Sequence, residues 1–228
     1  MNISTYSAII RTMIRDFLIN IMEWIGTVAF SVSGVLVAVG CSLDLFGVII
    51  VGCITAVGGG MMRDLLLGRV PPQIFFNPAI LLVAVLTAVT VFIIAYINAK
   101  KFKGLRERVE KINNLFDALG LAAFSVTGVE IACNGGYADN ALIAITMGVI
   151  TGVGGGILRD VLVNEKPYVL TKHIYAVASI IGSGIYYLAR TFTGYDVVGT
   201  FAAVGITIMI RLLAAKYRWE LPKINLKG

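Results

Sequence analysis

Two short sequences in this chain combine three consecutive glycines with an arginine–aspartate pair. They read GGGMMRD at 58–64 and GGGILRD at 154–160, and each lies in an apolar segment. Charged side chains are costly in such segments and commonly mark functional sites. Each glycine weakens a helix by about 1 kcal/mol relative to alanine, so we predict a broken helix at both places. The candidate residues are Gly58, Gly59, Gly60, Gly154, Gly155, Gly156, Arg63, Asp64, Arg159 and Asp160.

The predicted helix breaks would expose backbone carbonyl groups inside a membrane. An unwound backbone is tolerated there only where it is buried in protein or lines a cavity. Two breaks at matching places therefore favour a central pathway, in which the freed carbonyls face a cation or water. The alternative is that the glycines only allow two helices to pack closely.

The two arginine–aspartate pairs follow the glycine runs by three residues. One interpretation places a charged vestibule at each mouth of a pore, where Asp64 and Asp160 attract cations. In the other, each pair anchors the end of a helix and binds the neighbouring loop. Both interpretations remain open, and they are compatible.

Hydroxyl side chains accompany small residues in two further segments, which read FSVSG and FSVTG. Such groups can line a wet passage or can form hydrogen bonds across a dry helix interface. Glu130 lies in the second segment's helix, where the first segment has Leu36. It is a candidate for gating or ion contact, unless it lies near the outer membrane interface. The pore-lining candidates are Ser31, Ser33, Ser125, Thr127 and Glu130.

These motifs belong to a duplicated unit. The sequence GTVAFSVSGVLVA at 26–38 matches GLAAFSVTGVEIA at 120–132, and ITAVGGGMMRDLLLGRVP at 54–71 matches ITGVGGGILRDVLVNEKP at 150–167. Both pairs occur in the same order, which indicates an internal repeat. Each unit contains three predicted membrane spans. Because three is odd, the second copy enters the membrane from the opposite side, as in inverted-repeat transport proteins.

The composition requires a membrane around these elements. Hydrophobic residues make up 58% of the 228-residue chain and charged residues 14%, with a mean hydropathy of +0.88. A span needs about 20 mostly apolar residues. We predict an all-α membrane protein with seven transmembrane helices, forming one membrane domain over 1–228. The spans are 22–40, 47–67 and 79–97 in repeat one (22–97), 114–133, 141–162 and 173–190 in repeat two (114–190), and a seventh helix at 197–215.

The segment before the first span has one apolar face at helical spacing. It is either an interfacial lead-in or an extension of that span. Basic residues are concentrated in the loop between the third and fourth spans and in the C-terminal tail, which places the N-terminus outside and the C-terminus in the cytoplasm of a cell (inner) membrane. The loop at 100–111 could also bind anionic lipid. Its basic residues and those of the tail are Lys100, Lys101, Lys103, Arg106, Arg108, Lys111, Lys216, Arg218, Lys223 and Lys227.

Several function classes are disfavoured by what the sequence lacks. It has no GxxxxGK[ST] motif for ATP, and the single His173 leaves no Ser/His/Asp or Cys/His set, so we expect no enzyme, cofactor or metal site. The three cysteines are scattered and are predicted to be free. The net charge of +6 comes from loops and tails, which fits a membrane surface better than nucleic acid.

The paired GGGxxRD motifs resemble the trimeric intracellular cation channel (TRIC) family, as do the FSVSG and FSVTG segments and the three-plus-three-plus-one layout. The resemblance covers nearly the whole chain, and the short loops and tail are similar to the prokaryotic branch. It implies a homotrimer with one pore per subunit that passively conducts potassium and other monovalent cations. It also implies that the glycine runs kink the second and fifth helices around the pore. The basic gating residue of animal members has no counterpart in the predicted span 114–133.

Three functions therefore stand as hypotheses. The first is a potassium-permeable channel without catalysis. The alternative is a secondary transporter for a small zwitterion such as glycine, because helix N-termini at the breaks would attract a carboxylate. The third is a structural or regulatory membrane protein that transports nothing, in which the glycine runs serve only packing.

Overall fold

The computed structural model describes residues 3–98, 106–171, 174–193 and 196–219, and all regular secondary structure in these ranges is helical. Some residues on which the sequence-based predictions rest lie outside the described ranges: Lys100, Lys101, Lys103, His173, Lys223 and Lys227. Anionic-lipid binding at 100–111 therefore stays a prediction.

Every predicted span overlaps a helix of the structure. The long helices are α1 (Ile3–Gly40), α2 (Leu45–Leu66), α3 (Pro78–Ile97), α5 (Arg106–Ala132), α6 (Ala141–Leu162), α8 (Tyr175–Leu188) and α9 (Asp196–Tyr217). Shorter helical turns are η1 (Gln73–Phe75), η2 (Cys133–Tyr137), α7 (Tyr168–Thr171) and η3 (Ala189–Thr193). Six of the long helices are long and apolar enough to cross a membrane, and the shorter α8 continues into η3. The count of seven spans stays a prediction.

The amphipathic N-terminal segment is continuous with the first span. Helix α1 runs from Ile3 to Gly40 without interruption, so this segment is an extension of the first helix rather than a separate lead-in.

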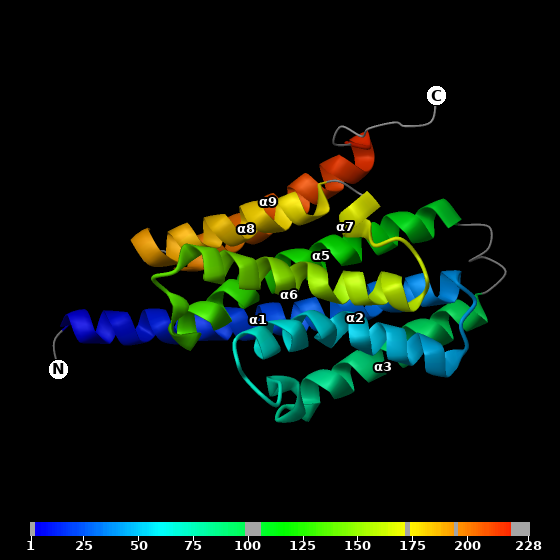
Figure 1. The fold of residues 1–228 in the computed structure, drawn as a ribbon, viewed down its shortest axis with the longest axis horizontal. Helices are drawn as coiled ribbons and strands as arrows, with labels where there is room; N and C mark the ends of the chain where they lie inside the picture. Colours follow the sequence, from blue (N-terminus) through cyan, green and yellow to red (C-terminus); the bar gives the residue numbers. More distant parts are fainter. Residues whose placement is uncertain (1–2, 99–105, 172–173, 194–195, 220–228) are drawn as a thin grey trace.

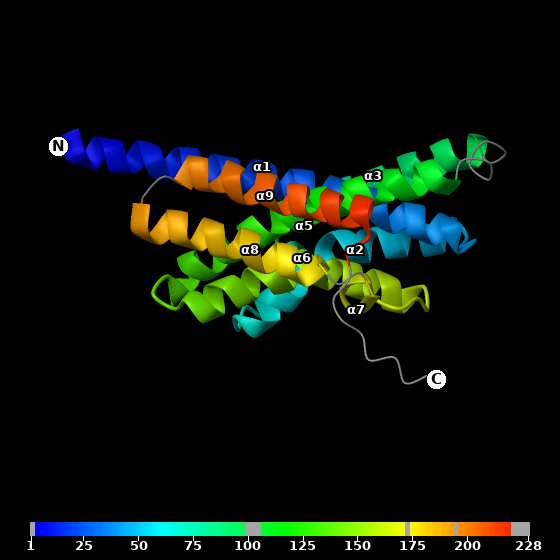
Figure 2. The same ribbon diagram turned by 90° about the horizontal axis from the view of Figure 1, so that it is seen from above.

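The long helices lie roughly along one axis of an elongated bundle (Figures 1 and 2). We call the two ends of this bundle the N-end, where α1 begins, and the C-end, where α9 ends. Helices α3 and the α8–α9 pair lie on opposite flanks, and the other long helices lie between them (Figure 1). Helix α1 runs from the N-end toward the C-end, whereas its sequence counterpart α5 runs in the opposite direction (Figure 1). The relation of this arrangement to the membrane stays a prediction.

The centre of the bundle joins the two sequence copies to each other. Helix α1 packs on α5, and α2 packs on α6. At the α1–α5 contact the rings of Phe30 and Phe124 lie 5.3 Å apart. A Cβ added to Gly120 would meet the Phe30 ring at 2.1 Å, and one added to Gly26 would meet the Phe124 ring at 2.8 Å. Each copy therefore supplies one ring and one glycine to the other, and a larger residue at either glycine would require the facing ring to move.

The ends of α2 and α6 are built alike from corresponding residues. Asp44 caps α2 by accepting a hydrogen bond from the Gly47 amide, and Asn140 caps α6 through the Ile143 amide. These side chains satisfy amide groups that a helix start leaves unpaired. Both helices therefore begin at positions that the sequence copies share.

The predicted breaks at the triple glycines are wrong for the backbone. Helix α2 continues through Gly58–Gly60 to Leu66, and α6 continues through Gly154–Gly156 to Leu162. Among the described glycines, only Gly68 and Gly136 have a positive φ. The physical reason is that an unwound segment in lipid would leave backbone groups without partners, which costs more than the low helix propensity of glycine.

Candidate functional site

The glycine runs form the closest contact between the two copies. A Cβ at Gly59 would lie 2.2 Å from the backbone oxygen of Thr151, and a Cβ at Gly155 would lie 2.1 Å from that of Thr55. The two contacts are reciprocal, because each glycine of one helix faces the threonine of the other. We call this place the glycine crossing. The packing alternative therefore describes Gly59 and Gly155 in this structure.

A polar cavity of about 200 Å³ lies on the N-end side of the glycine crossing. We call it the N-end cavity. It is bounded by α1, α2, the segment around η1, α3, α5 and α6, so both sequence copies contribute to its wall. Its polar lining residues are Glu23, Thr27, Gly60, Arg63, Asp64, Gln73, Asn77, Thr127 and Thr151. Two carboxylates and one guanidinium thus surround a space that ends beside the crossing.

The Arg63–Asp64 pair shapes the wall of this cavity. The Arg63 guanidinium donates from Nε and Nη2 to Asp64 Oδ1 at 2.9 and 2.7 Å. The other carboxylate oxygen of Asp64 accepts the backbone amide of Gln73 at 2.9 Å. Asp64 therefore fixes the loop that follows α2 while its side chain faces the cavity. At this end the carboxylate of Asp64 thus both anchors a loop and lines a cavity.

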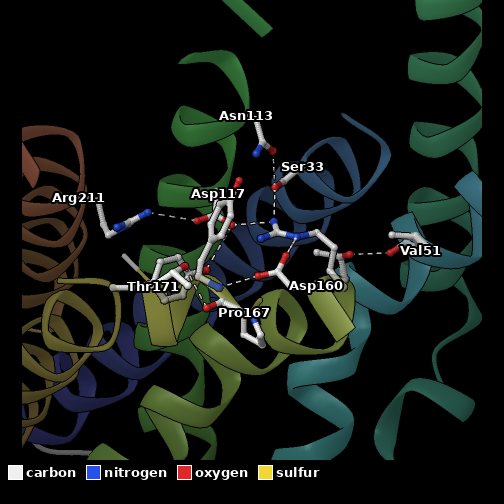
Figure 3. A network of polar contacts seen from close by, with 12 residues as sticks. Ser33, Val51, Asn113, Asp117, Asp160, Pro167, Thr171 and Arg211 are labelled. Atoms are coloured by element: carbon white, nitrogen blue, oxygen red, sulfur yellow. Dashed lines mark hydrogen bonds and ion pairs between the residues drawn. The ribbon is translucent and has the colours of Figure 1, made fainter. Parts of the chain in front are cut away.

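The second pair, Arg159–Asp160, has the same geometry, but both of its side chains are buried. Arg159 Nε donates to Asp160 Oδ1 at 2.8 Å, and Asp160 Oδ2 accepts the amide of Tyr168 at 2.8 Å. The Arg159 side chain, however, is completely buried and also forms an ion pair with Asp117 at 2.9 Å. Its Nη1 further donates to Ser33 at 2.6 Å (Figure 3). Here the guanidinium fills the space between the helices, toward the C-end.

The network around Asp117 extends to the last helix. Tyr175 donates its hydroxyl to Asp117 Oδ1 at 3.3 Å. Arg211 of α9 places Nη2 at 3.6 Å from Asp117 Oδ2, and its guanidinium lies 4.4 Å from the centre of the Tyr175 ring (Figure 3). Asn113 accepts a hydrogen bond from Ser33 at 2.8 Å. A buried polar network, the Asp117 network, therefore ties α1, α5, α6, α8 and α9 together.

Three charged residues at these sites, Glu23, Asp117 and Arg211, lie outside the motifs that the sequence predicted to be functional. Glu23 and Asp117 each precede the matched glycines Gly26 and Gly120 by three residues, so the repeat itself pairs them. Glu23 is half-buried in the wall of the N-end cavity, whereas Asp117 is fully buried in its ion pair. Aligning the copies a few residues further upstream would have found both. Arg211 lies on a helix without a counterpart in the repeat, so no such comparison pointed to it.

The predicted hydroxyl residues are all buried but do not act together. Thr127 lines the N-end cavity. Ser31 donates to the backbone oxygen of Ala84 on α3 at 2.8 Å, and Ser125 lies 2.6 Å from the hydroxyl of Ser179 on α8. These two serines therefore form dry helix contacts.

Glu130 lies apart from the N-end cavity lining. Its carboxylate pairs with Arg15 of α1 at 3.0 Å and with Arg190 at 2.5 Å, and Tyr186 donates to it at 3.0 Å. The side chain is only 1% exposed. This arrangement joins the first half of α1 to α5 and α8, which agrees with a structural role near the N-end.

The described residues contain no group of three or more His, Cys, Asp or Glu side chains that could hold a metal ion. Cys41, Cys53 and Cys133 are free, as predicted; Cys41 is exposed and the other two are buried. The site is thus made of ion pairs, hydroxyls and close glycines, which can arrange water and ions but offer no nucleophile with a paired base.

Solved structures of cation channels share this fold. A TRIC orthologue from Rhodobacter sphaeroides matches with a TM-score of 0.79 and 33% identity, over 89% of this chain and 99% of that one. A prokaryotic TRIC channel in 0.5 M KCl matches with a TM-score of 0.79 and 35% identity, over 90% and 99%. The chain is therefore an all-helical, multi-pass membrane protein with the TRIC channel fold.

Sequence comparisons give the family. A family model described as a glycine transporter matches twice, at 20–96 and at 114–191, which agrees with the internal duplication. A UPF0126 membrane protein of Vibrio cholerae is 39% identical over 94% of this chain and 86% of its own length. The inner membrane protein YadS of Escherichia coli is 39% identical over 90% and 95%. The chain belongs to the TRIC family, in its prokaryotic branch.

Proposed function

We propose that this chain is a passive channel for potassium and other monovalent cations. The observation that carries the proposal is the N-end cavity, a polar space between the two copies that ends at the glycine crossing. The carboxylates of Glu23 and Asp64 make this space attractive to cations, and threonine hydroxyls can replace water around an ion. The solved relatives of the same fold are cation channels, which supports the same function here.

We interpret the conformation as a closed one. The path beyond the glycine crossing is filled by Arg159, which is held by two carboxylates and a serine hydroxyl. A cation approaching this guanidinium meets a like charge and a dry, packed region. Conduction therefore requires the Asp117 network to rearrange, so that Arg159 leaves the space between α1 and α6.

A carrier for a small zwitterion such as glycine is the alternative, and the matching family model is described as a glycine transporter. That hypothesis depended on broken helices whose exposed N-termini would bind a carboxylate. Helices α2 and α6 are continuous at both glycine runs. The positive helix ends that would bind such a substrate are therefore missing at this place, and the channel is the better supported function.

Ion flux from liposomes separates the two functions. Purified protein is reconstituted into potassium-loaded liposomes, with valinomycin as the positive control and labelled glycine uptake measured in parallel. We expect electrogenic potassium efflux without saturable glycine uptake. Saturable glycine uptake without a potassium leak would identify a carrier instead. The absence of both activities would favour the structural or regulatory role.

Substitution at the glycine crossing links the flux to this site. Gly59→Leu or Gly155→Leu places a large side chain against a backbone oxygen, so we expect the flux to fall. Gly205→Leu is the matched control, because nothing lies within 4 Å of a Cβ at that glycine. Unchanged flux in a folded crossing variant would assign both glycines to packing alone.

The assembly and orientation belong to the same proposal. We infer a homotrimer with one pore per subunit and seven spans in two inverted repeats plus α9, in the inner membrane with the N-terminus outside. The trimeric relative supports the homotrimer, and the inner membrane relative supports the location. The mass of the protein in detergent, corrected for bound detergent, tests the trimer; a monomeric mass at the concentration used for flux would contradict it.

A further inference from the structure

A second cavity, of about 280 Å³, lies at the C-end beside α9. We call it the C-end cavity. It is lined by Glu110 and Asn114 of α5, by Thr171 and Ile174 before α8, by Arg211 in the second half of α9, and by Arg218 and Trp219 directly after that helix. It shares no lining residue with the N-end cavity. Ligand binding in this space can therefore be measured separately from conduction through the other one.

Arg211 gives the C-end cavity an unusual polar wall. The residue is only 3% exposed, yet no hydrogen bond reaches its Nε. Its Nη2 stands 3.6 Å from Asp117 Oδ2, beyond hydrogen-bond distance, and that carboxylate oxygen has no hydrogen bond either. A guanidinium carries five N–H donors, and buried donors are nearly always paired. A group with acceptor oxygens in the cavity would supply hydrogen-bond partners for the unpaired donors of Arg211.

The other lining residues indicate which acceptor fits. The planar donor fork of arginine matches the oxygens of phosphate, and Arg218 supplies a second cation at the rim. Glu110 reduces the charge of the lining to one net positive charge, which matches one negative charge better than two. Trp219 at the same end has the amphipathic side chain typical of a membrane interface.

We propose that the C-end cavity binds a phosphate oxyanion through Arg211 and Arg218, and that the singly charged phosphodiester of a phospholipid headgroup fits it best. The cavity lies at the end of the bundle, where headgroups meet the ends of the spans. A headgroup phosphate at Arg211 would also compete with Asp117 for this guanidinium, since the two lie only 3.6 Å apart.

Binding to purified protein in a phosphate-free, non-ionic detergent tests the site. Dihexanoyl phosphatidylglycerol is the lipid probe and inorganic phosphate the free one, each titrated by calorimetry. We expect Arg211→Gln to weaken lipid binding by about tenfold or more, and Arg218→Gln by a smaller factor. Arg11→Gln removes an exposed cation of α1 near the opposite end, outside the cavity lining, and should leave binding unchanged.

The exposed Arg218 keeps the test informative if Arg211→Gln fails to fold. Phosphate binding that depends on these arginines, without lipid binding, would support the oxyanion site and identify a soluble ligand. Equal lipid affinities in Arg218→Gln, Arg11→Gln and the unaltered protein would overturn the proposal. So would the absence of binding by either probe, which would mean that the cavity holds water only. None of these readouts requires ion conduction, so failure of the proposed channel function would leave them unaffected.

Discussion

Alanine at Gly155 tests how tightly the two copies are held together. The added Cβ would lie 2.1 Å from the backbone oxygen of Thr55. Relieving this contact to about 3.0 Å requires α2 and α6 to separate by about 0.9 Å, and a backbone oxygen inside a helix cannot move alone. Overpacking of this kind typically costs about 1–3 kcal/mol. For a chain of this size that corresponds to a fall in melting temperature of about 2–12 °C.

The assay is thermal unfolding in detergent, followed by the fluorescence of the two tryptophans. Gly205→Ala is the matched control, because a Cβ there meets nothing within 4 Å and alanine favours the helix by up to about 1 kcal/mol. We expect Gly155→Ala to unfold at a lower temperature than this control. Equal melting temperatures would refute the conclusion that the helices are in backbone contact.

The reciprocal geometry adds a second, sharper expectation. Gly59 contacts Thr151 at the same crossing, and a Cβ on it would lie 3.2 Å from the Gly155 nitrogen. Separation of the helices by one alanine therefore makes room for the other. The double variant Gly59→Ala/Gly155→Ala should lose less stability than the two single variants together. If the stability losses of the two single variants are strictly additive in the double variant, the structure relaxes independently around each contact.

Three other perturbations have defined outcomes. Asp117→Asn removes a carboxylate from two buried arginines and should lower the free energy of unfolding by about 3–5 kcal/mol. Glu107→Gln at an exposed ion pair is the control and should change this free energy little. Equal melting temperatures of the two variants would contradict this expectation. The proposed orientation places Cys41 on the cytoplasmic side, so a membrane-impermeant maleimide should label it in inside-out vesicles but not in spheroplasts. The reverse result would show that the protein has the opposite orientation. The labelling rate should rise with pH as the thiolate forms, and this rise should occur at higher pH than for an unperturbed thiol, because partial burial and the nearby Glu165 carboxylate raise the pKa of Cys41. Asp64→Asn should shift the reversal potential in a KCl gradient toward zero if the N-end cavity carries the ions.

The sequence predicted the helices well because hydropathy and helix ends are local properties. The span predicted at 141–162 coincides with α6, and the one at 79–97 differs from α3 by one residue. The glycine runs were misread for an equally physical reason. Helix propensity alone predicts a break, but close packing between two glycine-rich helices and the need to pair backbone groups in lipid outweigh it.

The candidate site was predicted only in part. Four of the candidate residues, Gly60, Arg63, Asp64 and Thr127, line one cavity, but nothing in the sequence indicated that Thr127 lies beside the other three. The buried ion pair of Arg159 with Asp117 could not be predicted from the sequence, because it joins α5 to α6 across 42 residues. Arg211 was beyond prediction as well, since its partner depends on where α9 docks on the second copy.

The difference between Glu23 and Asp117 shows what the fusion of two copies makes possible. In a pair of separate, identical three-helix chains, one substitution would alter both ends of the assembly at once. Here each copy has its own carboxylate residue, which can change without the other. Glu23 therefore lines an acidic cavity near one end, while Asp117 forms a buried ion pair with Arg159 near the other. A channel with unlike ends responds differently to currents in opposite directions, so the proposed function allows rectification here, whereas the symmetry of a pair of identical, oppositely oriented chains would exclude it.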